Sequence, residues 1–223
     1  MPNIKPWALI VDDHPIYRSG LKSVLLKTYK FFKIKEAPNG MEALKILADI
    51  PQIQVVFMDI EMPVMNGVEA SKKILKLYPD IKIIVTTMFS EPKFISEMVS
   101  INVSAYILKD SSLGEITKAV EMVLDNQPYY SAKIQDIIIT GYKGKKRPKV
   151  EPTLDLITNG QKQVLTLLCN QYSNSEIAKE LDVSELTIKR HRQDLLERTN
   201  SKNFAGLIIF AIEHGLYDVK KKF

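Results

Sequence analysis

Five polar residues in the first half of the chain stand at or just beyond the ends of short apolar runs. Runs of this length that stop at turn residues are typical of buried strands. A carboxylate placed there is costly to bury unless a metal, another cation or hydrogen bonds compensate its charge. The five are Asp12 and Asp13 after WALIV, Asp59 at the end of QVVFMD, Thr87 at the end of KIIVTT, and Lys109 at the end of AYILK.

Together these side chains have the composition of a site that receives a phosphoryl group. Three neighbouring carboxylates repel one another and need a cation to stay ionised. Oxygen ligands favour a hard ion such as Mg²⁺, which also binds phosphate oxygens. A carboxylate can attack phosphorus, and the metal, the Lys109 ammonium and the Thr87 hydroxyl would bind the three phosphoryl oxygens. We therefore hypothesise that Asp59 accepts a phosphoryl group.

Each residue also has an ordinary explanation on its own. Asp13 could cap a helix that begins near Pro15, Thr87 could bond to its own backbone, and Lys109 could be a solvated surface charge. Those explanations require all five residues to reach one place by coincidence, whereas a shared site requires no coincidence.

The segments that must position this site alternate between apolar strands and amphipathic helices. Five alternations predict βαβ units and a doubly wound α/β domain with a five-stranded parallel sheet. Ligands of such domains bind beyond the carboxyl ends of the strands, where all five residues would meet. The expected strands are 7–13, 33–37, 54–59, 82–87 and 105–109, and the expected helices lie near 15–28, 40–49, 67–77, 92–101 and 112–125.

The pattern changes after residue 126, which we take as the end of the first domain. Residues 127–155 are expected to form a linker, because DNQPYY interrupts the periodicity and YKGKKRPKVEP has little to bury. A short amphipathic helix is expected within it at 131–141. Residues 156–223 show only helical periodicity and predict a small all-α domain of four helices.

Within the second domain, SNSEIAKELDVSELTIKRHRQDLLERT has the form helix, tight turn, helix. Ser173 with Glu176 forms a capping-box pattern, and Ser184 can cap the next helix. Such a pair of helices can place its second helix in the DNA major groove. The alternative is a helical bundle with a basic, solvated surface. Four residues are expected on the free side of the second helix: Lys189, Arg190, Arg192 and Gln193.

Charge and composition limit the classes of function. Residues 1–128 hold as many acidic as basic residues, so the whole formal net charge of +5 lies in residues 129–223. That asymmetry favours a polyanion partner, although a soluble basic face would look the same. The one cysteine, Cys169, excludes an intramolecular disulfide. No apolar run approaches the ~20 residues of a membrane span or resembles a secretory signal, so a cytoplasmic protein is expected.

Residues 7–126 resemble the receiver domain of two-component response regulators, through IVDDH, VFMDIEMPVMNG, VTTMFSE and AYILKDSS. The resemblance implies a flavodoxin-like fold and phosphorylation of Asp59 by a sensor histidine kinase or an acyl phosphate. It implies that Asp12, Asp13, Asp59 and the backbone carbonyl of Glu61 hold Mg²⁺. It also implies that Thr87 and Tyr106 are switch residues, the hydroxyl drawn to the phosphoryl group and the ring turned inward. Many receivers have proline after this lysine, but here Asp110 follows.

Residues 156–217 resemble the LuxR-type helix-turn-helix of NarL/FixJ-like regulators, through SNSEIAKELDVSELTIKRH and the later HGL. The sequence departs from that pattern at Gln161, usually acidic, at Leu186, usually polar, and at Thr199, usually leucine. The resemblance implies base contacts from Lys189, Arg190 and Gln193, with His191 and Arg192 nearer the DNA backbone. The full set of expected DNA-binding residues is Ser184, Thr187, Lys189, Arg190, His191, Arg192 and Gln193.

The sequence therefore predicts a transcription regulator whose DNA binding is controlled by phosphorylation of Asp59. Phosphorylation would favour a homodimer that binds inverted or direct half-sites. One alternative is an aspartate-dependent phosphohydrolase, although Glu61 stands where such enzymes usually have a second aspartate. Another is an orphan regulator that binds DNA constitutively and keeps its acidic pocket as a relic.

Overall fold

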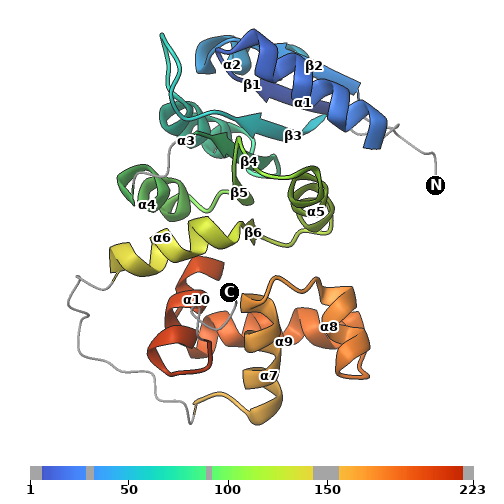
Figure 1. Cartoon of the computed structure of the whole chain (residues 1–223), viewed down its shortest axis with the longest axis vertical. Coiled ribbons are helices and arrows are strands. Elements are labelled where there is room, and N and C mark those ends of the chain that lie inside the picture. Colours follow the sequence, from blue (N-terminus) through green and yellow to red (C-terminus); the bar gives the residue numbers. More distant parts are fainter. Residues whose placement is uncertain (1–6, 29–32, 89–91, 143–155, 218–223) are drawn as a thin grey trace. The chain divides into compact units, whose positions relative to one another are not determined.

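The structure is a computed structural model, which describes residues 7–28, 33–88, 92–142 and 156–217. The chain divides into two compact units, residues 1–131 and residues 132–223 (Figure 1). Most of the expected linker, residues 143–155, lies outside the described residues. Within the described ranges, none of the helices combines the length and the apolar character needed to cross a membrane.

The first unit is a doubly wound α/β domain, as predicted. Its six parallel strands are ordered β2-β1-β3-β4-β5-β6, so the chain winds outward in both directions from β1. The strands are β1 (Trp7–Val11), β2 (Lys33–Ala37), β3 (Ile53–Met58), β4 (Lys82–Thr87), β5 (Ala105–Leu108) and β6 (Tyr129–Tyr130), and the helices are α1 (Pro15–Thr28), α2 (Gly40–Asp49), α3 (Gly67–Leu77), α4 (Pro92–Ser100) and α5 (Leu113–Leu124).

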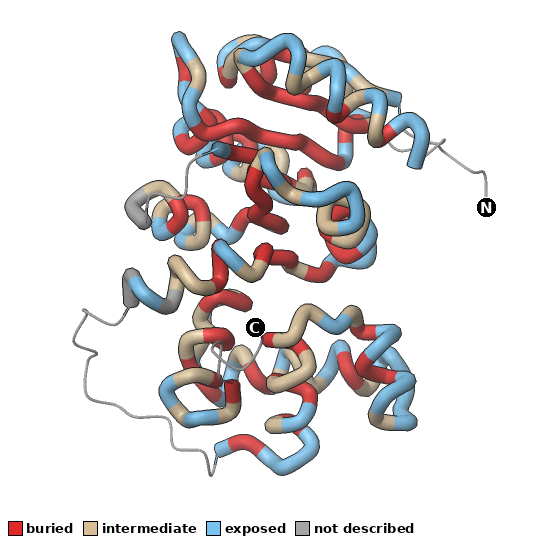
Figure 2. The backbone as a smooth tube through the Cα atoms, viewed as in Figure 1, coloured by how far each residue is buried: buried red, intermediate tan, exposed pale blue. Residues whose placement is uncertain are grey.

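The sheet is buried on both faces, which explains the unbroken apolar runs of its central strands. Strands β3, β4 and β5 are buried along nearly their whole length (Figure 2). One face packs against α1 and α5, where Leu21, Leu25 and Val120 meet Ile10, Phe57 and other strand residues. Residues of the opposite parity on the strands, such as Tyr106, face the other side of the sheet.

The sixth strand corrects the expected count of five. DNQPYY was interpreted as a breaker, yet Tyr129 and Tyr130 pair in parallel with Ala105 and Tyr106. Both tyrosines are buried, and the backbone N–H of Ser131 extends the ladder by donating to the carbonyl of Tyr106 over 3.0 Å. Burial of two large aromatic side chains offsets the conformational entropy lost when this segment is ordered. The segment is too short to show periodicity in the sequence.

Among its described residues, the second unit is helical and contains the four helices predicted for 156–223 and the one predicted at 131–141. They are α6 (Ala132–Tyr142), α7 (Asn159–Cys169), α8 (Asn174–Glu180), α9 (Glu185–Arg198) and α10 (Phe204–Glu213). The helix expected at 131–141 is α6, but it packs against α10 within this unit and is not part of a free linker. The Tyr217 hydroxyl, 3.4 Å from Gln135 Oε1, adds a polar contact between α6 and the segment that follows α10.

Candidate functional site

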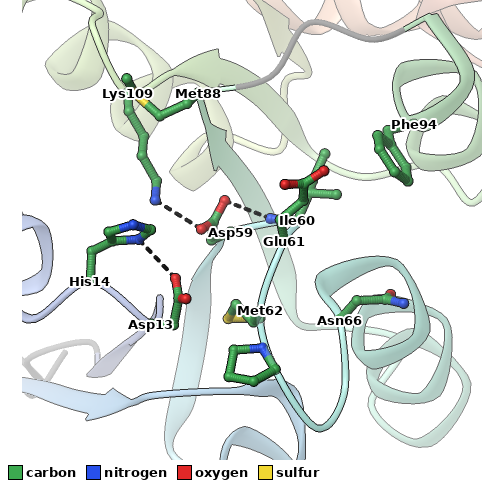
Figure 3. Close-up of a pocket in the computed structure, with 11 residues that line it drawn as sticks. Asp13, His14, Asp59, Ile60, Glu61, Met62, Asn66, Met88, Phe94 and Lys109 are labelled. Atoms are coloured by element: carbon green, nitrogen blue, oxygen red, sulfur yellow. Dashed lines mark hydrogen bonds and ion pairs between the residues drawn. The ribbon is translucent and has the colours of Figure 1, made fainter.

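The backbone places the acidic residues at one edge of the sheet because the hydrogen-bond ladder continues one residue past the strands. The Asp12 N–H donates to the Ala37 carbonyl over 3.1 Å, and the Asp59 N–H donates to the Val11 carbonyl over 2.8 Å. The Lys109 N–H donates to the Thr87 carbonyl over 2.8 Å. The predicted ends of strands β1, β3 and β5 therefore converge, as Figure 3 shows for Asp13, Asp59 and Lys109.

Lys109 binds both buried carboxylates of the pocket. Its ammonium lies 2.6 Å from Asp12 Oδ2 and 2.8 Å from Asp59 Oδ2, and its side chain is only 5% exposed. The other Asp59 oxygen, Oδ1, accepts a 2.7 Å hydrogen bond from the Ile60 N–H. The ammonium also lies 4.8 Å from the centre of the Tyr17 ring, within reach of a cation–π interaction. Lys109 is thus fixed by charge on two sides and by an aromatic ring.

The charge balance of the pocket shifts the protonation of its groups. Burial raises the pKa of the Asp59 carboxyl, and the neighbouring Asp12 charge adds to that rise, although Lys109 partly offsets both. Burial alone would lower the pKa of Lys109, but its bonds to Asp12 and Asp59 outweigh burial and leave the pKa raised. The ammonium therefore stays charged, and a further cation would favour the ionised form of Asp59.

Replacing Asp59 with asparagine should stabilise the metal-free protein at neutral pH. The folded carboxyl has a pKa above its ordinary value of 3.8, so the folded state holds the proton more tightly. Protonation of Asp59 therefore stabilises the folded state fully at pH values below the ordinary pKa of 3.8, and this stabilisation is lost as the pH rises through the folded pKa. Asp59→Asn avoids that loss, while Lys109 keeps Asp12 as partner.

Urea unfolding of both proteins in EDTA, from about pH 3 to about pH 7, checks this expectation. The free energy of unfolding of the variant should increasingly exceed that of wild type as the pH rises, and the two free energies should converge at the lowest pH. A variant less stable than wild type at neutral pH would show that the charge on Asp59 stabilises the fold.

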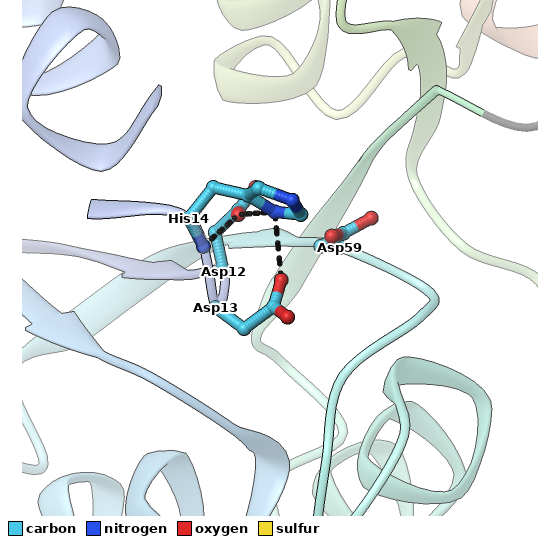
Figure 4. Close-up of side chains that lie close together, drawn as sticks. All are labelled: Asp12, Asp13, His14 and Asp59. Carbon is cyan, nitrogen blue, oxygen red and sulfur yellow. Dashed lines mark hydrogen bonds and ion pairs between the residues drawn. The ribbon is translucent and has the colours of Figure 1, made fainter. Parts of the chain in front are cut away.

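The acidic cluster fits a divalent metal site. Ligand atoms of Asp12, Asp13, His14 and Asp59 all lie within 4.8 Å of one another (Figure 4). Asp12 is fully buried, so water cannot hydrate its carboxylate. A hard cation bound there would stabilise the negative charge in place of water. His14 Nδ1 lies 3.2 Å from Asp12 Oδ1 and 2.8 Å from Asp13 Oδ1. His14 directly follows the acidic pair in the sequence, and this adjacency brings its ring to both carboxylates.

A pocket of about 750 Å³ opens beside Asp59. Its polar wall contains Asp13, Asp59 and Lys109, and Figure 3 shows these side chains pointing toward one another. Other polar residues at its edge are His14, Glu61 and Asn66, and five apolar residues complete the lining: Ile60, Met62, Pro63, Met88 and Phe94. A small phosphorylated donor could reach the Asp59 carboxylate from this side.

The two expected switch residues lie on adjacent strands and on the same face of the sheet. Val85 pairs with Tyr106 and Thr87 with Leu108, so the side chains of Thr87 and Tyr106 have the same parity. Both residues are fully buried, and the Tyr106 ring is therefore already turned inward. Within the described residues, the Tyr106 hydroxyl has no hydrogen-bond partner. Burial, and to a lesser degree the charge of Asp59, raises its pKa.

In the second unit, α8 and α9 form the predicted helix-turn-helix pair. Ser173 and Glu176 make both bonds of the capping box at the start of α8. The Ser184 side chain accepts from the Thr187 N–H and so caps α9. Ile188 and Leu195 are buried, and Lys189, Arg190 and Gln193 are exposed on the opposite side of α9.

The remaining residues expected to contact DNA already have partners or are partly buried. The Arg192 guanidinium donates to the side chain of the buried Asn174 over 3.0 Å, so Arg192 does not lie on the free side of α9 where it was expected. Helical periodicity explains this, because residue 192 follows the buried Ile188 by one turn. His191 is half-buried, and the hydroxyls of Ser184 and Thr187 lie 2.8 Å apart.

Two departures from the expected family pattern are accommodated locally. Gln161 is buried, completes a capping box with Thr158, and places its amide nitrogen 3.4 Å from an Asp194 oxygen. Thr199 is buried too, and its hydroxyl donates to the Leu195 carbonyl over 2.7 Å. A polar side chain therefore replaces the usual one at each position without leaving its polar group unpaired.

Comparisons with known proteins agree with this architecture. Residues 8–121 match the model of the response regulator receiver domain, and residues 155–211 match that of the luxR family of bacterial regulatory proteins. The transcriptional regulatory protein YhcZ of Bacillus subtilis is 32% identical, over 93% of this chain and 96% of its own. The transcriptional regulatory protein MctR of Rhizobium johnstonii is 31% identical, over 93% and 94%.

Solved structures show the same fold. A structure of two RcsB dimers bound to two parallel DNAs has a TM-score of 0.58 and 20% identity, covering 94% of this chain and 98% of the RcsB chain. A LuxR-family response regulator from Aurantimonas sp. has a TM-score of 0.54 and 27% identity, covering 58% of this chain and 92% of its own.

The family is one of transcription regulators and not of turnover enzymes, so the phosphohydrolase alternative is set aside. The acidic pocket and the helix-turn-helix are the two functional parts that this family combines. The chain belongs to the response regulators: it is a phosphorylation-controlled, DNA-binding transcription regulator with a receiver domain and a luxR-family domain.

Proposed function

We propose that Asp59 accepts the phosphoryl group and that Asp12, Asp13, Asp59 and the backbone carbonyl of Glu61 hold Mg²⁺. The observation that carries this proposal is the pairing of one ammonium, Lys109, with the two buried carboxylates Asp12 and Asp59. Mg²⁺ would supply positive charge to the phosphoryl oxygens and keep the carboxylates ionised.

The residues of the pocket have distinct tasks in the transfer. A carboxylate oxygen of Asp59 attacks phosphorus and forms the new P–O bond, while the bond to the donor breaks and its electron pair leaves with the donor. The donor is a phosphohistidine of a cognate sensor histidine kinase or a small acyl phosphate. Lys109 neutralises charge on a phosphoryl oxygen and the Thr87 hydroxyl donates to another, so the chain contributes positioning and electrostatics.

Phosphorylation would act on DNA binding by shifting a pre-existing equilibrium between two states. Thr87 and the inward Tyr106 lie on one face of the sheet, so movement of the hydroxyl toward the phosphoryl group would change the packing around the ring. The favoured state is a homodimer whose two α9 helices bind inverted or direct half-sites in double-stranded DNA. The structure of RcsB, a protein of the same fold, as two dimers bound to two parallel DNAs supports this arrangement.

DNA binding measured with and without phosphorylation tests this function. A random duplex pool is selected with the full chain in Mg²⁺ and acetyl phosphate, and affinities for the selected site are then compared. Wild type should bind more tightly after acetyl phosphate, and Asp59→Ala should not respond. A footprint unchanged by acetyl phosphate and by Asp59→Ala would indicate the constitutive orphan regulator instead.

Arg190→Ala should relax sequence preference at one base pair of the selected site. An exposed arginine can bind guanine O6 and N7 through two parallel hydrogen bonds, and losing them costs about 1–3 kcal/mol. Lys202→Ala removes an exposed positive charge outside α9 and serves as the control. Affinities for single-base variants of the site would reveal the change. Equal weakening by Arg190→Ala at every sequence would contradict base recognition by this residue.

A further inference from the structure

A large apolar side chain lies exposed in the first turn of α9. Leu186 is 60% exposed, although the other leucine or isoleucine residues that anchor this helix, Ile188 and Leu195, are fully buried. Ser184 caps the helix and Thr187 lies at the cap, so the backbone that carries Leu186 is fixed. Leu186 therefore presents its methyl groups to solvent from a rigid position.

The neighbours of Leu186 on the helix surface are the residues proposed to reach the bases. Lys189, Arg190 and Gln193 follow it by three, four and seven residues, which places all four on one face opposite Ile188. All four are exposed. The Gln193 amide donates to Glu197 Oε1 over 2.7 Å one turn further along the helix. Leu186 is thus an apolar side chain at the N-terminal end of a mostly basic and polar face.

The exposed face of α9 that carries Leu186 fits one kind of partner, double-stranded DNA. A face with two cations attracts DNA phosphates and bases, whereas a partner surface that is purely apolar would leave Lys189 and Arg190 desolvated. Leucine has no donor or acceptor, so it can recognise only an apolar feature of a base pair. The major groove offers one such feature, the C5-methyl group of thymine. The N-terminal residues of a recognition helix are the ones that lie against base edges.

We propose that Leu186 packs against the C5-methyl group of a thymine in the operator and so determines specificity at that base pair. This assignment rests on the proposed function, because it requires α9 to enter the major groove. It adds an apolar contact to the polar contacts of Lys189, Arg190 and Gln193, and it selects T·A over C·G at a position next to the one that Arg190 reads.

Deoxyuridine provides the test, because it pairs as thymine does but lacks the methyl group. The full chain, treated with Mg²⁺ and acetyl phosphate, is bound to its selected duplex and to duplexes with one thymine at a time replaced by deoxyuridine. Wild type should lose affinity about fourfold at one position of each half-site, which corresponds to ~0.8 kcal/mol for one buried methyl group. Leu186→Ala should bind thymine and deoxyuridine at that position equally.

Two further variants complete the design. Leu186→Met keeps an apolar side chain and should retain discrimination, while Leu77→Ala removes a leucine of similar exposure, 63%, from the receiver domain and should change nothing. Specific binding in which no deoxyuridine substitution matters, or in which Leu186→Ala still discriminates, would overturn the assignment alone. Absence of any sequence-specific binding by wild type would overturn the proposed function and this assignment with it.

Discussion

Lys109→Met should destabilise the protein by about 3–5 kcal/mol at neutral pH, as removal of one partner from a buried ion pair does. The ammonium lies 2.6 Å from Asp12 and 2.8 Å from Asp59, and both carboxylates are buried. Methionine retains an apolar stem of similar length, so the loss would come from two uncompensated charges and not from a cavity. The variant should also lose phosphorylation of Asp59, because the ammonium that would neutralise charge on a phosphoryl oxygen is gone.

Denaturant unfolding beside a matched surface variant measures this effect. Lys22→Met removes an ion pair with Glu36 that is also short, 2.7 Å, but partly exposed on both sides, so it should cost at most about 1 kcal/mol. Adding Asp59→Asn to Lys109→Met should recover part of the lost stability, because one unpaired charge is removed. Similar losses for Lys109→Met and Lys22→Met would contradict the electrostatic account of the pocket.

Gly67→Ala should destabilise the receiver domain by about 3 kcal/mol, at the upper end of what overpacking costs. A Cβ at this position would lie 1.9 Å from the Asp59 carbonyl oxygen, and backbone atoms cannot rotate away as a side chain can. The Gly67 N–H donates to the Ile60 carbonyl over 2.8 Å, so the close approach also closes the loop that follows Asp59. The substitution would therefore displace the phosphoacceptor as well as lower stability.

Gly20→Ala is the matched control for this prediction. Gly20 lies within α1, and a Cβ there would meet no atom within 4 Å. Alanine should stabilise that helix by about 0.5–1 kcal/mol, because glycine loses more conformational freedom on folding. Thermal or urea unfolding should show that Gly67→Ala lowers the free energy of unfolding relative to wild type and that Gly20→Ala raises it. A Gly67→Ala protein as stable as wild type would mean that the loop can move away from α3 at little cost.

The sequence predicts this site well where chemistry and periodicity coincide. Continuous apolar runs place strands β3 and β4 to within one residue of their ends, and parallel strands that end together bring Asp12, Asp59 and Lys109 to one edge. The sequence predicts the capping residues as reliably as these strands, since the hydrogen bonds of Ser173 and Ser184 involve only residues three positions away. Helix caps can be predicted because they depend on local sequence, and the shared edge can be predicted because parallel strands have a fixed topology.

Long-range packing explains what the sequence left open. Strand β6 exists because Tyr129 and Tyr130 find a buried edge beside β5, which no pattern of two residues can reveal. Helical periodicity places Arg192 one turn after the buried Ile188, but its acceptor, Asn174 on α8, becomes its neighbour only through packing. The Lys109 ammonium lies over the Tyr17 ring because α1 begins near the carboxyl end of β1 and β5 ends beside it. Each depends on a partner that becomes adjacent only in the folded chain.

Intact-mass spectrometry is the most direct test of the central claim, that Asp59 is the phosphoacceptor. Wild type and Asp59→Asn would be incubated with Mg²⁺ and either acetyl phosphate or phosphoramidate, with folding checked by circular dichroism. Wild type should gain one phosphoryl group, Asp59→Asn should gain none, and wild type should gain none when EDTA removes the metal. An equal gain in Asp59→Asn, or a folded wild type that gains none from either donor, would contradict that claim.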